Sequence, residues 1–585
     1  MSKKPYQFIK NSLLVAFISL AFSCANIVAP TGGPKDMTPP VVKKCEPLNY
    51  SANFTGKKIR ITFDEYVVLE DQVNQIVVSP PTDKEAKFNI SGKSIVIDLP
   101  EKLSDSVTYS IYFGESVKDL NEGNPLSGYE FVFSKSNIVD SLSIQGYVYD
   151  ALTREAQKSI LVMLYTSDDD SVPIKSRPLY MTKTNAAGKF LLKNIRKEKY
   201  KIFALLDMNA DMMFNQPTES IAFADSLITP QYVSTLPDTA SKNEDSTSVN
   251  QDSLLQKEVI RSTILYLYTQ QDTNQQLLKA RADTYRQFKL IFKNPVRDLN
   301  ITVTNKQLPE NWKIDEYSSG RDTLTCWLSD PDQDTLKLII TDKGIIVDTA
   351  EIALKQKSDV QKPGKRPSGK GFTDTDEWKK LGISSNASGS TLLPYYLPVR
   401  LKLSNPIVKT DFSKIVLEEK IDSVFKGIKP DAILPDANVK RIFNISYNWE
   451  TEKKYRLLVL PGAFTDIYGL VNDSLLVNFS ADSPENYGRL LFTLKQNEGS
   501  KSYLVQLLKE DKSIVEQRPA KLNQQILFEN LSPADYRIRI VQDENNNGKW
   551  DGGDYFQKRQ PESVFYFPQI INIRANWDTE YEFVL

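Results

Sequence analysis

Apolar and polar residues alternate one by one along much of this chain. In Ile59–Phe63 the apolar side chains alternate with Arg60 and Thr62, and the same period of two runs through Tyr109–Phe113. Successive side chains of a strand point to opposite faces, so each stretch predicts a strand with one face in a core. Clusters of Gly, Pro, Asn and Asp separate these short strands. The pattern predicts an all-β fold, a multi-domain array of antiparallel β-sandwiches.

Two hairpins of similar sequence lie at 107–134 and 453–480. Each has a strand that contains a tyrosine (Tyr109 or Tyr455), a turn with Asp and Gly, and a closing strand rich in Phe. This hairpin resembles the last hairpin of bacterial Ig-like domains of the S-layer type. An opening strand recurs three times, and with it the resemblance implies Ig-like domains at 38–137, 259–355 and 379–481. The middle domain lacks the Asp-x-x-Gly turn, and its assignment depends on the opening strand alone.

A second pair of segments aligns without a gap 336 residues apart. Asn194, Tyr200 and Asp207 of the first segment match Asn530, Tyr536 and Asp543 of the second. Further on, the Gln-Pro-Thr-Glu-Ser sequence at 216–220 is echoed by Gln-Pro-Glu-Ser at 560–563. The earlier copy, at 138–232, resembles the carboxypeptidase-regulatory type of transthyretin-like sandwich, a module that is structural or binding and carries no catalytic residues. The later copy predicts a C-terminal β-sandwich at 482–585.

The first residues have the pattern of an export signal. Three lysines precede a ten-residue apolar run, Leu13–Phe22, which is too short to span a bilayer and which ends just before Cys24. The segment resembles a lipoprotein signal of the loose kind found in Bacteroidota. The resemblance implies a signal peptide at 1–23, lipidation of Cys24 and a tether at 24–37. The protein would then be lipid-anchored in the outer membrane, with the periplasmic or surface face undecided. The alternative is an ordinary signal peptide with a chance cysteine.

Two further segments have linker compositions. Residues 233–258 are rich in Ser, Thr, Asn and acidic residues and poor in apolar ones, which predicts disorder. Residues 356–378 combine lysines with Pro and Gly, which predicts a flexible basic linker. The alternative for the basic segment is contact with an anionic envelope component.

Charge and composition exclude several functions. The 73 Lys and Arg nearly balance the 74 Asp and Glu, so no overall positive field is available to gather nucleic acid. The chain of 585 residues has no histidine, which removes Ser-His-Asp and Cys-His nucleophiles and His-ligated zinc. There is no phosphate-binding or dinucleotide-binding glycine motif, and the Ser-x-x-Lys spacing at 423–426 is read as a coincidence. The sequence predicts no enzyme and no catalytic residues.

The segment 543–554 has the spacing of a calcium-binding loop. With Asp543 as position 1, oxygen side chains fall at positions 1, 3, 5, 9 and 12, glycine stands at 6, and the carbonyl of position 7 faces the same centre. The predicted ligands are Asp543, Asn545, Asn547, Lys549 (through its carbonyl), Asp551 and Asp554. Calcium is the predicted cofactor. The alternative is an Asn/Gly-rich turn without metal.

The earlier copy predicts a second, weaker metal site. Oxygen side chains again fall at positions 1, 3, 5 and 9, but Met212 replaces the glycine and Thr218 stands at position 12. The candidate ligands are Asp207, Asn209, Asp211, Asn215 and, one step beyond, Glu219.

We therefore expect a non-enzymatic cell-envelope lipoprotein that acts as a binding or scaffolding subunit of an outer-membrane or surface assembly. The alternatives are a glycan-binding or adhesive surface lipoprotein, and a carbohydrate-active enzyme with paired carboxylates. The expected partner is an envelope protein or a glycan. Glycan binding predicts exposed, coplanar aromatic rings on one sandwich face, whereas scaffolding predicts an apolar patch or a free sheet edge matched to a partner.

Overall fold

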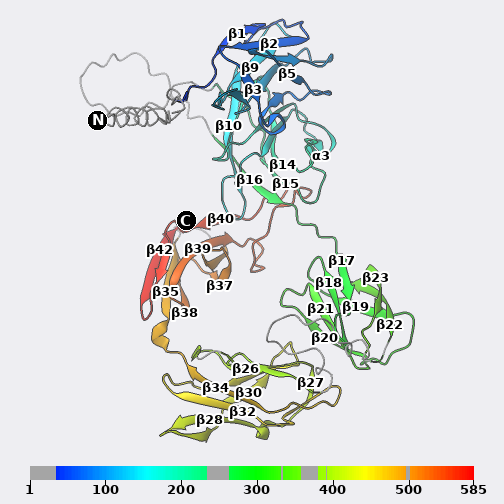
Figure 1. Ribbon diagram of the computed structural model, residues 1–585, viewed down its shortest axis with the longest axis vertical. Coiled ribbons are helices and arrows are strands. Elements are labelled where there is room, and N and C mark those ends of the chain that lie inside the picture. The colour runs from blue at the N-terminus through cyan, green and yellow to red at the C-terminus, as the bar shows by residue number, and fades with distance from the viewer. Residues whose placement is uncertain are drawn as a thin grey trace, which may run out of the picture. The chain divides into compact units, whose positions relative to one another are not determined.

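The structure is a computed structural model that describes residues 35–232, 262–330, 332, 334–356, 380–389, 392–495 and 501–585. The predicted all-β fold is confirmed, because nearly all regular structure in these ranges is strand (Figure 1). The chain divides into two compact units, Met1–Thr269 and Gln270–Leu585. Cys24, the whole predicted linker 233–258 and all of the predicted linker 356–378 except its first residue lie outside the described residues.

The first sandwich packs a four-stranded sheet against a three-stranded one. The sheets have the orders β1-β2-β6-β5 and β4-β7-β9, and a small pair, β3-β8, closes one end. The elements are β1 (Val42–Glu46), β2 (Lys58–Phe63), β3 (Val67–Leu69), α2 (Gln72–Gln75), β4 (Val77–Ser79), β5 (Lys87–Ser91), β6 (Ser94–Asp98), β7 (Thr108–Tyr112), β8 (Val117–Asp119) and β9 (Glu130–Ser134). The predicted alternation is observed, since Ile59, Ile61 and Phe63 are buried in the core while Arg60 is exposed.

The same strand order recurs in two further sandwiches of the second unit. In one, β17-β18-β21-β20 faces β19-β22-β23; in the other, β24-β26-β31-β30 faces β25-β34-β32-β28-β29, and β27-β33 repeats the small pair. The strands are β17 (Leu277–Arg281), β18 (Gln287–Phe292), β19 (Leu299–Val303), β20 (Lys313–Tyr317), β21 (Thr323–Leu328), β22 (Thr335–Asp342), β23 (Ile345–Ala353), β24 (Ile383–Ser385), β25 (Leu392–Leu393), β26 (Val399–Leu403), β27 (Ile407–Thr410), β28 (Ile415–Ile421), β29 (Val424–Ile428), β30 (Ala432–Pro435), β31 (Ile442–Ser446), β32 (Lys454–Val459), β33 (Phe464–Asp466) and β34 (Leu475–Ala481). Two 3₁₀ turns, η1 (Phe412–Lys414) and η2 (Pro484–Asn486), complete this part of the chain.

The repeated hairpin owes its form to one buried tyrosine and one buried aspartate. The hydroxyl of Tyr109 accepts the N–H of Ser104 at 2.8 Å, and that of Tyr455 accepts the N–H of Glu450 at 2.9 Å, each five residues back. Both tyrosines lie in the core. Asp119 ends β8 and accepts the N–H groups of residues 122, 123 and 124. The aspartate therefore holds the turn that leads back into the closing strand.

The two repeat copies of the other family have one topology. In the first, β13-β10-β16 and β12-β11-β14-β15 are joined through β15 and β16; in the second, β38-β35-β42 faces β37-β36-β39-β40, with β41 on β39. The elements are β10 (Leu142–Asp150), β11 (Leu161–Tyr165), α3 (Val172–Lys175), β12 (Tyr180–Lys183), β13 (Lys189–Ile195), β14 (Lys201–Leu206), β15 (Ser220–Phe223), β16 (Thr263–Thr269), β35 (Gly488–Lys495), β36 (Tyr503–Leu508), β37 (Ile514–Ala520), β38 (Gln525–Leu531), β39 (Ala534–Gln542), β40 (Val564–Tyr566), β41 (Ile571–Ile573) and β42 (Asp578–Val584).

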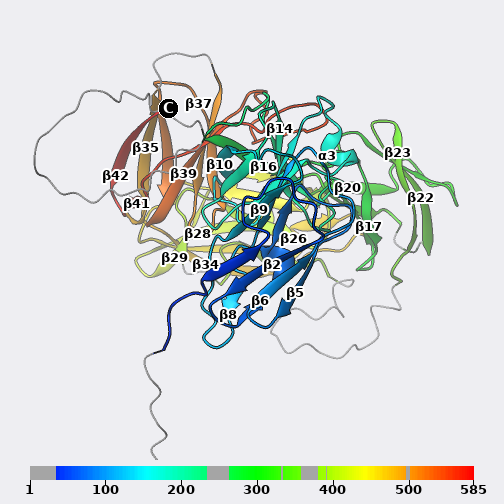
Figure 2. The same cartoon turned by 90° about the horizontal axis from the view of Figure 1, so that it is seen from above.

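Strand β16 corrects one predicted boundary. The sequence placed it in the domain at 259–355, but it pairs in parallel with β10 and antiparallel with β15, so it completes the second sandwich. Its counterpart β42 pairs in parallel with β35, and the two lie side by side in Figures 1 and 2. The third sandwich therefore begins after residue 269, and the boundary at 259 was wrong. Alternation marks a strand but does not identify its partner.

Candidate functional site

The C-terminal Asp/Asn loop is a compact turn that follows β39. The carboxylate of Asp543 accepts the N–H of Asn547 at 3.0 Å and the N–H of Gly548 at 2.9 Å. The side-chain amides of Asn545 and Asn547 both donate to Asp551. Gly548 has a φ of +74°, the left-handed conformation expected at the sharp turn. Four of the predicted ligands, Asp543, Asn545, Asn547 and Asp551, are thus brought together.

The two remaining predicted ligands are placed differently. The backbone of Asp554 pairs with that of Arg559, and its carboxylate accepts the N–H of Gln557 at 3.1 Å, in a separate turn. The ammonium group of Lys549 lies 3.5 Å from Asp551. In this geometry Asp554 serves its own turn and does not join the other four side chains.

A buried glutamate that the sequence prediction missed closes this loop. Glu562, only 4% exposed, accepts the N–H of Glu544 and the N–H of Asp551, both at 2.9 Å. Burial raises the pKa of Glu562, these two N–H groups oppose the rise, and the charges of Asp551 and Asp543 add to it. The sequence does contain a signal for Glu562, because Gln-Pro-Glu-Ser at 560–563 repeats the segment around Glu219. Seven additional residues precede Glu562, so it does not fall at a ligand position of the calcium-loop spacing.

The earlier loop is built in the same way. The carboxylate of Asp207 accepts the N–H of Met212 at 2.9 Å, and Asn209 and Asn215 donate to Asp211. Glu219 is fully buried and accepts N–H groups from Met208 and from residues 215 and 216. Glu219 and Glu562 therefore hold the same two loop positions. Met212 has a φ of +64°, the left-handed backbone conformation that Gly548 adopts in the later loop. This conformation is strained for a residue that has a side chain.

A lysine distinguishes the two loops electrostatically. Lys183 on β12 donates to the carbonyl of Asn74 at 3.1 Å. Burial lowers the pKa of Lys183, and the negative charges of Asp207 and Asp71 oppose this effect. The strand registers place Pro519 at the corresponding position of the later copy. The cation near the earlier loop thus comes from the neighbouring strand β12, whereas the later loop has an uncharged proline there and a lysine of its own, Lys549, 3.5 Å from Asp551.

Calcium at either loop stays a prediction. Within the described ranges, no group of three or more Cys, Asp or Glu side chains is close enough to hold a metal ion. The two carboxylate oxygens of Asp543 each accept one N–H group, whereas Asp551 Oδ2 already accepts both asparagine amides. A cation in the later loop would therefore depend on Asp543 and on the asparagine oxygens, with the amides turned away from Asp551.

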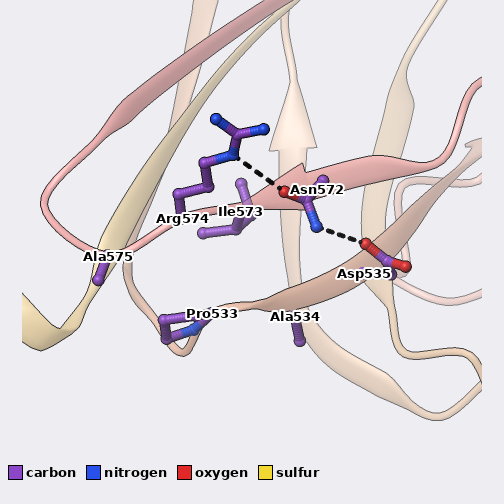
Figure 3. A pocket seen from close by; sticks show the side chains of 7 residues that line it. All are labelled: Pro533, Ala534, Asp535, Asn572, Ile573, Arg574 and Ala575. Atoms are coloured by element: carbon purple, nitrogen blue, oxygen red, sulfur yellow. Dashed lines mark hydrogen bonds between the residues drawn. The ribbon is translucent and has the colours of Figure 1, made fainter.

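The C-terminal sandwich also has an open depression of about 520 Å³ between β39 and β41 (Figure 3). Arg574 donates to Asn572 at 3.4 Å, and Asn572 donates to Asp535 at 2.8 Å. The polar groups of this wall therefore bond to one another. The remaining lining residues are Pro533, Ala534, Ile573 and Ala575. Nothing in this lining resembles a nucleophile with its base.

Specific contacts join the first and the last Ig-like sandwich to the repeat copy that follows each of them. Asn194 donates to Glu130 of the first sandwich at 3.2 Å, and its counterpart Asn530 accepts the hydroxyl of Tyr395, which precedes β26. At the first junction the N–H of Met181 also donates to the Ser79 hydroxyl at 3.0 Å, between β12 and β4. The same asparagine thus binds the preceding sandwich in both copies.

Comparison with known proteins agrees with this architecture. Residues 36–135 match the family of the bacterial Ig-like domain. This match covers the first sandwich. No curated protein matches the chain. Within the described ranges, no helix has the length and apolar character needed to cross a membrane.

Several solved structures share low overall similarity with the chain. The major pilin subunit BcpA of Bacillus cereus is 10% identical, with 76% of this chain and 99% of that chain covered and a TM-score of 0.13. The N-terminal part of the bacterial S-layer protein SbsC is 13% identical, with 36% and 44% covered and a TM-score of 0.15. The human desmocollin-1 ectodomain is 7% identical, with 93% and 98% covered and a TM-score of 0.14. Scores of this size carry no inference about function.

Proposed function

We propose that this chain is a non-enzymatic envelope lipoprotein, anchored in the outer membrane through Cys24, that acts as a binding or scaffolding subunit of a membrane or surface assembly. The observation that supports a scaffold is the repeated junction between an Ig-like sandwich and the copy after it. A binding module that worked alone would need no such junction, and flexible linkage is the default between domains.

The junction is built to resist bending. Asn194 and Ser79 are both buried, and Glu130 accepts the Ser110 hydroxyl as well as the Asn194 amide. Separating the sandwiches would exchange these hydrogen bonds for bonds to water, at a net cost of about 0.5–1.5 kcal/mol each. The two sandwiches of each pair are therefore held in one arrangement, as a scaffold requires.

Cross-linking in native membranes tests this function. The full chain with a C-terminal tag is expected to be cross-linked to, and purified with, the same envelope protein in constant stoichiometry. Glu130→Ala and Tyr395→Phe, which loosen the two junctions, should weaken that association. The exposed Glu580→Gln, on the fifth sandwich, should leave it unchanged. Recovery of the chain alone after cross-linking would contradict the scaffold.

A glycan-binding role is the second candidate, and one observation favours it. Two partly exposed tyrosine rings, those of Tyr147 and Tyr149, lie on the outer face of β10 with their planes at 11° to each other. The two candidates are compatible, because a scaffold can also hold a polysaccharide.

A further inference from the structure

The outer face of the β13-β10-β16 sheet carries an aromatic surface. Val148, Leu265 and Phe190 point into the core of the second sandwich, so their neighbours along each strand point outward. The residues that face outward are here called the tyrosine face: Tyr147 and Tyr149 on β10, Ile264 and Tyr266 on β16, and Lys189 and Leu191 on β13.

The rings of this face are partly exposed and ordered relative to one another. The centroids of Tyr147 and Tyr149 are 6.0 Å apart, and the guanidinium carbon of Arg154 lies 3.8 Å from the centre of the Tyr266 ring. Ile264, which lies beside Tyr147 on the neighbouring strand β16, is 51% exposed. Strand register places Ile264 beside Tyr147 and Tyr266 beside Tyr149, so the four side chains form one continuous surface.

The later repeat copy shows that the fold itself does not require these tyrosines. The paired registers of β35, β38 and β42 place Thr493 and Lys495 where Tyr147 and Tyr149 stand, and Glu582 and Val584 where Ile264 and Tyr266 stand. Lys495 and Glu582 form an ion pair at 2.6 Å, and Arg489 and Asp578 form another at 2.6 Å. That copy therefore has an ordinary solvated face. The aromatic face is a departure that needs a ligand to account for it.

Charge around the tyrosine face indicates which ligand fits. Lys189 is exposed and lies directly opposite Tyr147, and Arg154 covers Tyr266. The nearby carboxylate of Asp150 is engaged by the N–H groups of Leu152 and Thr153. Lys189 lies on β13, the edge strand of the sheet, so a cation borders the aromatic surface. Aromatic rings with hydroxyl groups, edged by cations, suit a sugar chain with negative groups.

We propose that the tyrosine face binds an acidic polysaccharide, with sugar rings against Tyr147 and Tyr149 and carboxylate groups at Lys189 and Arg154. This site rests on the second proposed function, glycan binding, and is independent of the scaffold junctions. Because Lys189 is exposed, its ionic contact should weaken as salt rises, while the aromatic contacts remain.

Affinity electrophoresis of the full chain tests the site, with alginate as the acidic probe and dextran as the neutral one. Alginate should retard the parent chain, and dextran should not. Tyr147→Ala with Tyr149→Ala should reduce the affinity by about tenfold or more, and Lys189→Ala should remove most of the salt dependence. Tyr147→Phe keeps the ring and should retain binding, which separates loss of contact from loss of folding. Thr493→Ala and Lys495→Ala, at the matched positions of the later copy, should have no effect.

Each of the other outcomes contradicts a different part of the proposal. If alginate does not retard the parent chain, glycan binding as a function is wrong. If alginate binds but the tyrosine variants bind equally well, glycan binding stands and this site is wrong. Equal retardation by dextran would contradict acid recognition. A photo-reactive residue at position 147 that cross-links to an envelope protein in intact cells would make the face a protein-docking surface and overturn the proposal.

Discussion

At the scale of single residues, buried carboxylates of this chain close turns by accepting backbone N–H groups. Asp119 holds the Ig-like hairpin, and Glu219 and Glu562 hold the two Asp/Asn loops. Each N–H contact stabilises the ionised carboxylate, so the turn and the charge depend on each other.

Asp119 predicts a pH-dependent turn. Burial works against ionisation of Asp119, but the N–H groups of residues 121–124 outweigh it and lower its pKa from 3.8 to about 2. Because the pKa of Asp119 is lower in the folded state than in the unfolded state, the ionised carboxylate stabilises the fold above pH 3.8. That stabilisation is lost as the pH falls towards 2. Asp119→Asn should therefore speed amide exchange in 117–126 at pH 7, with a difference from the parent that shrinks between pH 4 and 2. A difference independent of pH would mean that the charge is not involved.

Calcium binding is predicted at the later loop. At a few millimolar calcium, a site with a dissociation constant of about 0.1–1 mM adds roughly 1–2 kcal/mol of local stability. Amide exchange in 543–562 should slow accordingly in the full chain, and Asp543→Ala should abolish the effect. Asp207→Ala should change exchange in 543–562 little, because Asp207 belongs to the earlier loop. Equal exchange in chelator and in calcium would leave the loop as a turn without metal.

At the scale of elements, the parallel pairs β10–β16 and β35–β42 decide how each repeat copy is completed. The close approach of β16 explains Gly146, since a Cβ there would lie 1.9 Å from the carbonyl oxygen of Thr263 and 2.7 Å from the Phe190 ring. No side chain fits in that space without moving a strand.

Gly146→Ala is therefore expected to displace β16. Overpacking of this kind destabilises by about 1–3 kcal/mol, so β10 and β16 should lose amide protection while the later copy keeps it. Gly427→Ala on β29 is the matched control, because its Cβ would meet nothing within 4 Å, and protection there should be unchanged or improved. Equal effects of the two substitutions would contradict the close approach.

At the scale of the whole molecule, the segment 233–258 separates β15 from β16, which pair with each other. Limited proteolysis should cut within 233–258 and 356–378, as their composition predicts. After the first cut alone, the two fragments should still elute together under native conditions and separate only when denatured, because β16 stays in the second sandwich. Immediate separation would contradict the pairing of β16.

Anchoring is predicted to depend on Cys24. Cys24→Ser should move the protein from the membrane fraction to a soluble fraction, since a lipid is the proposed attachment. A high-salt wash distinguishes lipid from ionic attachment. Retention of the variant on washed membranes as firmly as the parent would contradict the lipid anchor.

Much of the architecture could be predicted because the information is local. Period-two alternation identified the strands Ile59–Phe63 and Tyr109–Phe113, and the turn that recurs with Asp and Gly located the two hairpins that close with it. Spacing also brought Asp543, Asn545, Asn547 and Asp551 into one loop, because neighbours in a tight turn cannot lie far apart.

Only the tertiary structure decided the long-range partners. It placed β16 beside β10 across more than a hundred residues, and it put Glu562, not Asp554, at the closing position of the later loop. It also gathered the tyrosine face from β10 and β16, although the strands are distant in sequence. Local pattern determines which face of a strand is apolar, but pairing depends on the free energy of packing whole sheets, which no single segment contains.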